Sequence, residues 1–327
     1  MAEGHADRQW GGSVSGRDAG RRPRWNPTPL VQISLPDVPR AVHISAKVEA
    51  ANPTASVKDR TARWMVDAAE DSGALDPGGT IVESSSGNTG IALAALGAER
   101  GYRVIIVCTM RVPEEKLSLL RLLGAEVRQV DDAELGSDCH YLRLCARIAA
   151  DEGGVFLNQY ENPANPRAHY ESTGPEIWDQ SNGNVDVFVA GGGTGGTVTG
   201  AGRYLKEQET SLAVVLADPV GSIYAHAHAT GELTDPVAYE VEAVGQAERM
   251  LPGNIDLELI DRVVSVPDSD SFAAGREVAA RCGVLCGPSG GLALAACKEV
   301  ADDAGPGTRI VTVLPDGAER YLSRGTR

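Results

Sequence analysis

The segment NPTASVKDR, residues 52–60, places a lysine where its positive charge is disfavoured. Its first three residues favour a turn, and Ser56 is the expected N-cap of a helix with apolar residues at helical spacing that ends at Gly73. Lys58 then lies in the first turn, where the positive end of the helix dipole favours the neutral amine over the ammonium. A solvated lysine on the surface of the helix would also fit this segment, so the rest of the chain must decide.

A glycine-rich loop at residues 191–196, GGGTGG, follows a β-rich run and precedes a helical one. Backbone N–H groups of such a loop at a helix N-terminus form a cradle for phosphate. Gly191, Gly193 and Gly196 also satisfy GxGxxG, and Asp218 ends the next predicted strand, where a dinucleotide-binding domain holds its ribose-binding acid. An NAD(P)-dependent dehydrogenase is therefore a competing hypothesis.

A second loop of this kind, SSSGNTG at residues 84–90, places hydroxyls and an amide among glycines. Ser86, Asn88 and Thr89, with exposed backbone N–H groups, form a small anion site that suits a carboxylate better than a pyrophosphate. A serine-rich helix N-cap is the structural alternative. Together, a lysine, a carboxylate pocket and a phosphate pocket indicate an amino acid that meets a phosphorylated aldehyde.

The elements that must position these residues alternate along the chain. The β-rich runs are followed by helical runs such as 90–101 and 114–125, a pattern that predicts parallel sheets covered by helices. The predicted strands are residues 80–84, 103–108, 125–130, 185–192, 212–218 and 309–316. They fall into two sets before and after about residue 160. Residues 159–178, with three prolines, are interpreted as a crossover between two α/β domains, whose cleft is the expected ligand site.

Composition narrows the function classes. A formal charge of -15 over 327 residues opposes nonspecific binding to nucleic acid or to an anionic membrane. No apolar run is long enough to span a bilayer, and the polar N-terminus lacks the apolar core of a signal peptide. The sequence therefore predicts a cytoplasmic protein, with residues 1–24 as a mobile N-terminal tail.

Cysteines and histidines give little sign of metal binding. The six cysteines are scattered without a CxxC pair, so buried free thiols are expected. His226 and His228 could approach one ion, but no third ligand stands beside them, and no metal site is predicted.

Five motifs in order along the chain resemble those of the pyridoxal-phosphate β-family (fold type II), specifically cysteine synthase and cystathionine β-synthase. They are NPTASVKDR, SSSGNTG, NQYENPANPRAHYESTGPEIW, GGGTGGTVTG and VLCGPSGG, and the similarity runs from about Pro27 to the final VLPDGAERYL. The resemblance implies two doubly wound α/β domains of the tryptophan synthase β type, with the cofactor in the cleft between them. Residues 25–45 plus 162–327 would form the larger domain, which binds the cofactor phosphate, and residues 46–161 the smaller, mobile domain, which binds the substrate carboxylate. A homodimer is implied as well.

The resemblance also implies roles for individual residues. Lys58 would form the internal aldimine with pyridoxal 5′-phosphate and act as the catalytic base, which explains why it must lose its proton. Asn88 would bond to the ring hydroxyl of the cofactor, and the neutral hydroxyl of Ser289 would face the pyridine nitrogen, favouring chemistry at Cβ. The phosphate would be held by Gly193, Thr194, Gly195, Gly196 and Thr197, and the substrate carboxylate by Ser85, Ser86, Thr89 and Gln159.

The implied reaction is β-replacement on an activated L-serine through an α-aminoacrylate. The donor would be O-acetyl-L-serine, O-phospho-L-serine or L-serine, and the product L-cysteine or a thioether amino acid such as cystathionine. AHYESTGPEIW is similar to B-type cysteine synthases, whereas DPVGSIY and YEVEAVG are similar to cystathionine β-synthase, with Glu242 available for the amine of an acceptor. Ala243 stands where both groups usually have Gly, which leaves the acceptor open.

Three alternatives accompany this interpretation. ESSSGN also occurs in relatives that use an amine nucleophile to make diaminopropionate-type precursors. A non-catalytic family member that acts in a complex would not need Lys58, Asn88 and Ser289 together. A dehydrogenase would explain neither Lys58 nor the carboxylate loop.

Overall fold

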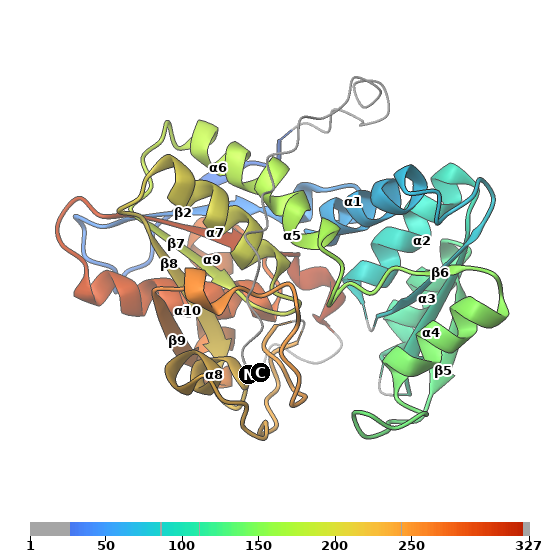
Figure 1. The fold of residues 1–327 in the computed structure, drawn as a ribbon. Coiled ribbons are helices and arrows are strands. Elements are labelled where there is room, and N and C mark those ends of the chain that lie inside the picture. The colour runs from blue at the N-terminus through green and yellow to red at the C-terminus, as the bar shows by residue number, and fades with distance from the viewer. Residues whose placement is uncertain (1–26, 86, 111, 243, 323–327) are drawn as a thin grey trace.

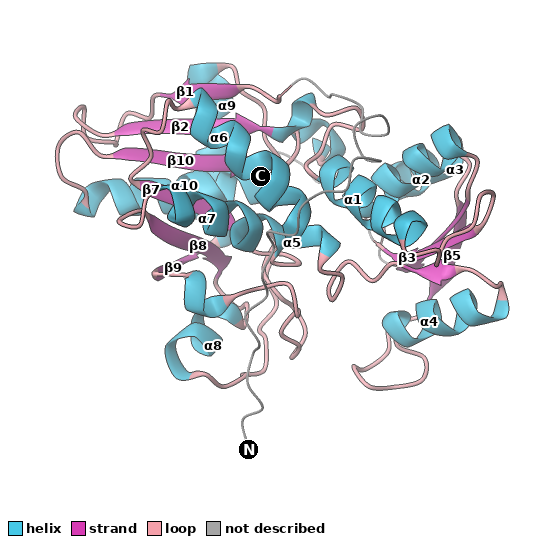
Figure 2. Ribbon diagram, turned by 45° about the horizontal axis from the view of Figure 1, so that its top comes forward, coloured by secondary structure: helices cyan, strands magenta, loops and turns pink. Residues whose placement is uncertain are grey.

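Two separate sheets organise the protein. The computed structural model describes residues 27–85, 87–110, 112–242 and 244–322. Within these ranges six strands form one sheet in the order β1-β2-β10-β7-β8-β9, and four strands form another in the order β5-β4-β3-β6. Figures 1 and 2 show each sheet with its own helices, as two units that lie side by side. We call them the six-stranded unit and the four-stranded unit.

The six-stranded sheet is parallel except for β1, which pairs antiparallel with β2. Its strands are β1 (Leu30–Ile33), β2 (His43–Val48), β7 (Val187–Gly191), β8 (Ala213–Pro219), β9 (Arg262–Val266) and β10 (Arg309–Leu314). Its helices are α5 (Ala164–Ala168), α6 (Gly174–Gln180), α7 (Gly196–Gln208), α8 (Tyr224–Thr230), α9 (Asp268–Cys282) and α10 (Pro288–Asp303). A π-helical segment, His169–Thr173, joins α5 to α6.

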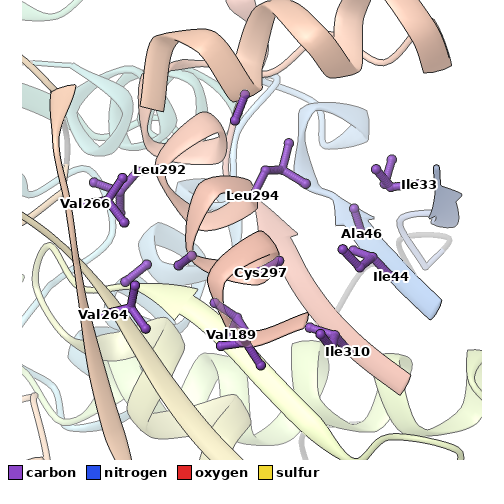
Figure 3. Close-up of a cluster of buried hydrophobic side chains, with 14 of the residues drawn as sticks. Ile33, Ile44, Ala46, Val189, Val264, Val266, Leu292, Leu294, Cys297 and Ile310 are labelled. Carbon is purple, nitrogen blue, oxygen red and sulfur yellow. The ribbon is translucent and has the colours of Figure 1, made fainter. Parts of the chain in front are cut away.

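Alternate residues of the central strands face opposite helical layers, as the two-residue period of a strand requires. Ile44, Val189 and Ile310 pack against Leu294 and its neighbours on α10, together with part of α9 (Figure 3). Residues of intervening positions, such as Phe188 on β7 and Val214 on β8, pack instead against α6 and α7. Burial on both faces gives these strands almost continuous apolar sequences.

The four-stranded sheet is parallel and is likewise covered on both faces. Its strands are β3 (Thr80–Ser84), β4 (Arg103–Thr109), β5 (Glu126–Val130) and β6 (Val155–Phe156). Its helices are α1 (Lys58–Asp71), α2 (Asn88–Arg100), α3 (Glu114–Leu122) and α4 (Tyr141–Asp151). Helices α1 and α2 pack on one face and α4 on the other, which places the loop after β3 at the edge that faces the six-stranded unit (Figure 2).

The six predicted strands all form, within two residues of their predicted ends. Four strands were not predicted: β1, β2, β6 and β9. The helical run in the crossover begins at Ala164, earlier than the prolines suggested, because Pro166 lies in the first turn of α5 and Pro175 in the first turn of α6, where no N–H is needed. The predicted domain boundaries at 45/46 and 161/162 stay a prediction, and β2 runs across the first of them while pairing within the larger sheet.

Other expectations can be placed on the structure. The predicted tail, residues 1–24, lies outside the described residues. All six cysteines are free, but Cys139 is exposed and Cys282 is half-buried, contrary to the expectation of burial. Nowhere in the described chain do three or more His, Cys, Asp or Glu side chains cluster as metal ligands. None of the described helices is both long enough and apolar enough to cross a bilayer.

Candidate functional site

A cavity of about 430 Å³ lies between the two units. The four-stranded unit contributes the loop after β3 and Lys116 of α3, and the six-stranded unit contributes the loop after β7, Tyr239, Glu242 and residues 244–248. A smaller cavity shares Lys58 and Thr194 with it and continues toward Ser289. The residues predicted to bind cofactor and substrate therefore line two adjoining cavities, although the sequence places them more than 200 positions apart.

Lys58 is the first residue of α1 and borders both cavities. Burial lowers the pKa of its amine, against the opposing field of the Asp316 and Glu49 carboxylates. The predicted N-cap is wrong by one residue: Val57 holds the flanking position, and Ser56 Oγ accepts only a long bond of 3.4 Å from the Lys58 N–H. A first-turn lysine with a lowered pKa is nevertheless the arrangement expected from the sequence.

The loop after β7 has the shape of an anion cradle. Gly195 adopts a φ of +83°, and a Cβ there would lie 2.5 Å from Ile255 Cβ, so the position requires glycine. At Gly196 a Cβ would lie 2.1 Å from Asn165 Oδ1. Helix α7 begins at Gly196, so its free N–H groups and positive dipole end are directed to the smaller cavity.

Ser289 lies in the first turn of α10 and borders the same cavity. Its side chain is 2% exposed, and its hydroxyl has no hydrogen-bond partner among the described residues. Buried hydroxyls are normally paired, so this orphaned group indicates a polar partner that enters the cavity. A pyridine ring with its phosphate on the glycine loop fits this arrangement of donors.

The loop after β3 brings the predicted carboxylate ligands together. Thr89 Oγ1 donates to Gln159 Oε1 at 2.6 Å, and both residues line the larger cavity. Ser85 also lines it, but its Oγ accepts the N–H groups of Gly87 and Gly90, at 3.1 and 2.9 Å, and so supports the start of α2. Ser86 lies outside the described residues.

Glu83 is a buried support of the loop after β3, and no sequence motif pointed to it. It is fully buried at the end of β3, where it accepts the backbone N–H groups of Ser84 and Gln159 at 2.8 and 3.2 Å. Burial raises the pKa of Glu83 to about 8, despite these bonds. Glu83 therefore couples the end of β3 to the backbone at Gln159.

Asn88, the first residue of α2, is held from the six-stranded unit. Its Nδ2 donates to Asp316 Oδ2 at 2.6 Å, and its Oδ1 accepts from Arg320. Tyr321 Oη donates to the same Asp316 oxygen at 2.5 Å. Burial raises the pKa of Asp316, against the hydrogen bonds from Tyr321 and Asn88. Asp316, Arg320 and Tyr321 all belong to the motif VLPDGAERYL. The family resemblance ends at this motif and implied no role for its members.

Two side-chain contacts connect the units at the larger cavity. Lys116 Nζ lies 2.6 Å from Glu242 Oε2 and 4.8 Å from the centre of the Tyr321 ring. His140 Nε2 lies 3.2 Å from Glu248 Oε2. Glu242 was predicted to bind substrate, whereas Lys116 was not singled out, and no local sequence pattern indicates its partner.

Asp218 does not serve the cavities. It is fully buried at the end of β8, where Oδ2 accepts the Ala225 N–H at 3.0 Å near the start of α8. It is not among the residues that line either cavity, so it is not placed as a ribose-binding acid. His228 Nε2 is likewise engaged, at 2.8 Å from the Ile260 carbonyl oxygen.

Known proteins resemble the chain over most of its length. Cystathionine beta-synthase of Apis mellifera is 40% identical over 91% of this chain and 59% of the relative. The chain thus spans little more than half the length of the animal relatives it matches. Cysteine synthase A of Salmonella typhi is 39% identical over 90% of this chain and 91% of the relative. The O-acetylserine dependent cystathionine beta-synthase of Bacillus subtilis is 36% identical over 91% and 94%, respectively.

A solved structure and a family model give the same result. The crystal structure of O-ureido-L-serine synthase superposes with a TM-score of 0.84 at 35% identity, covering 93% of this chain and 95% of that one. The model of the family described as "Pyridoxal-phosphate dependent enzyme" matches residues 22–316, which include both loops, Lys58 and Ser289. The chain therefore belongs to the pyridoxal-phosphate dependent enzyme family.

Proposed function

We propose that the protein is a β-replacing enzyme that exchanges the β-substituent of an activated L-serine for a nucleophile. The observation that carries the proposal is the convergence of Lys58, the carboxylate loop, the glycine loop and the orphaned Ser289 hydroxyl on two adjoining cavities. Relatives named cysteine synthase and cystathionine beta-synthase support the same reaction class.

The cofactor would be held at four places. Lys58 would bind its aldehyde carbon, Asn88 the ring hydroxyl, Ser289 the ring nitrogen and residues 193–197 the phosphate. The chemistry that pyridoxal phosphate supplies when bound is electron withdrawal from Cα of the amino acid, which acidifies the Cα–H bond.

The chain's own residues then direct the reaction. Thr89, Gln159 and the loop after β3 hold the substrate carboxylate and so orient the Cα–H bond. Lys58 Nζ, whose pKa is lowered by burial, takes the proton from Cα and returns it after the nucleophile has joined Cβ. Ser289 offers a neutral hydroxyl instead of a carboxylate, which favours departure of the β-substituent over storage of negative charge in the ring.

The substrates and setting are part of the proposal. The donor is O-acetyl-L-serine, O-phospho-L-serine or L-serine, and the product is L-cysteine or a thioether such as cystathionine. An amine nucleophile is the second candidate, which the ESSSGN sequence favours. We further propose, on the basis of the family resemblance, that the enzyme is a cytoplasmic homodimer.

Borohydride reduction tests the assignment of Lys58. Reduction of the cofactor-loaded protein should add one cofactor mass to the peptide that contains Lys58. Lys58→Ala should still bind cofactor through the glycine loop but should not release acetate from O-acetyl-L-serine. Lys206→Ala, which removes a lysine from the outer part of α7, is the control and should keep both properties. A reduced adduct on another lysine would refute the assignment.

A further inference from the structure

Two threonine hydroxyls, that of Thr194 in the glycine loop and that of Thr197 in the first turn of α7, are each contacted from behind by a buried polar side chain. Asn165, from α5, is 1% exposed, and its Nδ2 lies 2.8 Å from Thr194 Oγ1. His169, from the π-helical segment, is fully buried, and its Nε2 lies 3.3 Å from Thr197 Oγ1. The direction of these two hydrogen bonds decides what the threonines can offer to a ligand.

The amide of Asn165 has only one possible orientation. Its Nδ2 lies 2.8 Å from the backbone carbonyl oxygen of Gln159, which can only accept. The nitrogen must therefore face Gln159, and its second hydrogen is donated to Thr194 Oγ1. The amide oxygen is left facing Thr61, whose Oγ1 lies 3.2 Å away.

This orientation fixes the hydroxyl of Thr61, which has a single hydrogen. Because Asn165 Oδ1 can only accept, Thr61 must donate to it. Thr61 Oγ1 also lies 3.3 Å from His169 Nε2, and with its hydrogen already used it can only accept there. His169 must therefore carry a hydrogen on Nε2.

Nε2 is the only ring nitrogen of His169 that carries a hydrogen. Burial lowers its pKa well below the usual range, and the nearby charges of Lys58 and Arg60 lower it further. A neutral imidazole with Nε2 protonated has an unprotonated Nδ1, which accepts from Thr173 Oγ1 at 2.9 Å. The Nε2–H is shared between Thr61 and Thr197, both at 3.3 Å.

We propose that Asn165 and His169 are positioning residues that turn the hydroxyl protons of Thr194 and Thr197 into the glycine loop. Each threonine oxygen accepts from behind, so its own hydrogen is left to be donated into the cavity that both residues line. Together with the backbone N–H groups of the loop, this gives a cradle made only of donors. Such a cradle suits a fully ionised phosphate ester, which has only acceptors. The proposal rests on the proposed function of the loop as the phosphate site.

The test compares the binding of pyridoxal phosphate and of pyridoxal to protein freed of cofactor, followed by protein fluorescence. Both ligands have the aldehyde that reacts with Lys58, so their affinity ratio reports the phosphate alone. His169→Gln can place an amide N–H where Nε2–H lies, whereas His169→Asn reaches only to the position of Nδ1. Asn165→Asp replaces the donors to Thr194 and Gln159 by acceptors.

We expect His169→Asn and Asn165→Asp to weaken pyridoxal phosphate binding about ten- to a hundredfold, because a hydrogen bond to a charged group is lost. Pyridoxal binding should not change, and His169→Gln should stay close to wild type. Equal weakening of both ligands would mark a purely structural role and overturn the inference.

Further measurements distinguish failure of this inference from failure of the proposed function. If the wild-type protein binds pyridoxal phosphate no better than pyridoxal, the proposed function loses its phosphate site. If Thr194→Val and Thr197→Val leave the preference for phosphate intact, the threonine hydroxyls do not hold the phosphate and the inference fails, although the backbone N–H groups of the loop can still bind it. If these variants lose the preference but His169→Asn keeps it, only the inference fails. Independently of variant folding, ¹⁵N NMR of the wild-type protein should show His169 protonated on Nε2, and protonation on Nδ1 would contradict the argument.

Discussion

Lys116 Nζ lies 2.6 Å from Glu242 Oε2 and thereby joins α3 of the four-stranded unit to the segment that follows α8 in the six-stranded unit. The Lys116 side chain is only 6% exposed and also faces the Tyr321 ring. A pair so shielded from water is stronger than a surface ion pair. It must break whenever the two units separate, so it bears directly on how well the cavity excludes water.

Loss of this pair should let water compete with the nucleophile. In Lys116→Met we expect a severalfold larger share of the donor to end as pyruvate and ammonia, because the cleft closes less firmly. The share is measured as pyruvate formed per product formed. Arg121→Met is the matched control, since it removes an exposed ion pair with Glu114 on the same helix. An unchanged pyruvate share would show that the pair does not govern closure.

Glu242 can distinguish between classes of acceptor. An amino-acid acceptor such as homocysteine brings an ammonium that needs a partner in the cleft, whereas sulfide brings none. Glu242→Gln should raise the apparent KM for homocysteine about tenfold, the usual effect of losing a charged hydrogen bond. The KM for sulfide should stay nearly unchanged, because the Gln oxygen can still accept the hydrogen bond from Lys116 Nζ.

Steady-state kinetics with both acceptors provides the measurement, and the exposed Glu240→Gln is the control. Equal losses with both acceptors would mark Glu242 as part of cleft closure. No loss with either would remove it from the site.

Ser289 should tolerate loss of its hydroxyl better than gain of a charge. Ser289→Asp would hold a proton on the ring nitrogen through a charge-assisted hydrogen bond of about 1.5–3 kcal/mol, and turnover should fall strongly. Ser289→Ala should keep part of its activity. Rates are measured as acetate release from O-acetyl-L-serine, and an Asp variant as fast as wild type would show that Ser289 does not face the ring.

Asp218 makes stability depend on pH in a calculable direction. Burial raises its pKa from 3.8 to about 6 in the folded protein. The folded state therefore binds the proton more tightly than the unfolded chain, and this contribution is complete below pH 4 and is lost as the pH rises through 6. A shift of this size corresponds to about 3 kcal/mol.

Asp218→Asn keeps an acceptor for the Ala225 N–H and removes the buried charge. Its free energy of unfolding, measured by urea denaturation, should match wild type near pH 4 and exceed it above pH 6. Asp131→Asn, at an exposed position after β5, should show no such divergence. If the free energies of unfolding of Asp218→Asn and wild type changed in parallel with pH, burial would not raise the pKa of Asp218.

Residues that act next to each other in sequence could be predicted, and those joined only by packing could not. Lys58, the loop after β3 and the loop after β7 carry their geometry in local turn and glycine patterns. Lys116 and Glu242 are far apart along the chain, so no local pattern relates them. Asp316 became part of the site only because β10 brings it beside Asn88.

The unpredicted strands have a similar cause. In β2 a lysine interrupts the apolar pattern, yet Lys47 is fully buried and its Nζ lies 2.7 Å from Glu176 Oε2 of α6. From its sequence alone the strand therefore looks partly polar, because no local pattern reveals the distant partner of Lys47. β6 has only two residues, too few for any periodicity.

The position of β10 sets an order of events during synthesis on the ribosome. It is the last strand of the described residues, yet it lies between β2 and β7 in the sheet. Until residues 309–314 have left the ribosome, the emerging chain holds two incomplete pieces of that sheet with exposed edges. The strands of the other sheet all lie between residues 80 and 156, so that sheet can form early. The nascent chain can therefore form the loop after β3 before the loop after β7 is anchored in a complete sheet, and we expect chaperones to bind mainly in that interval.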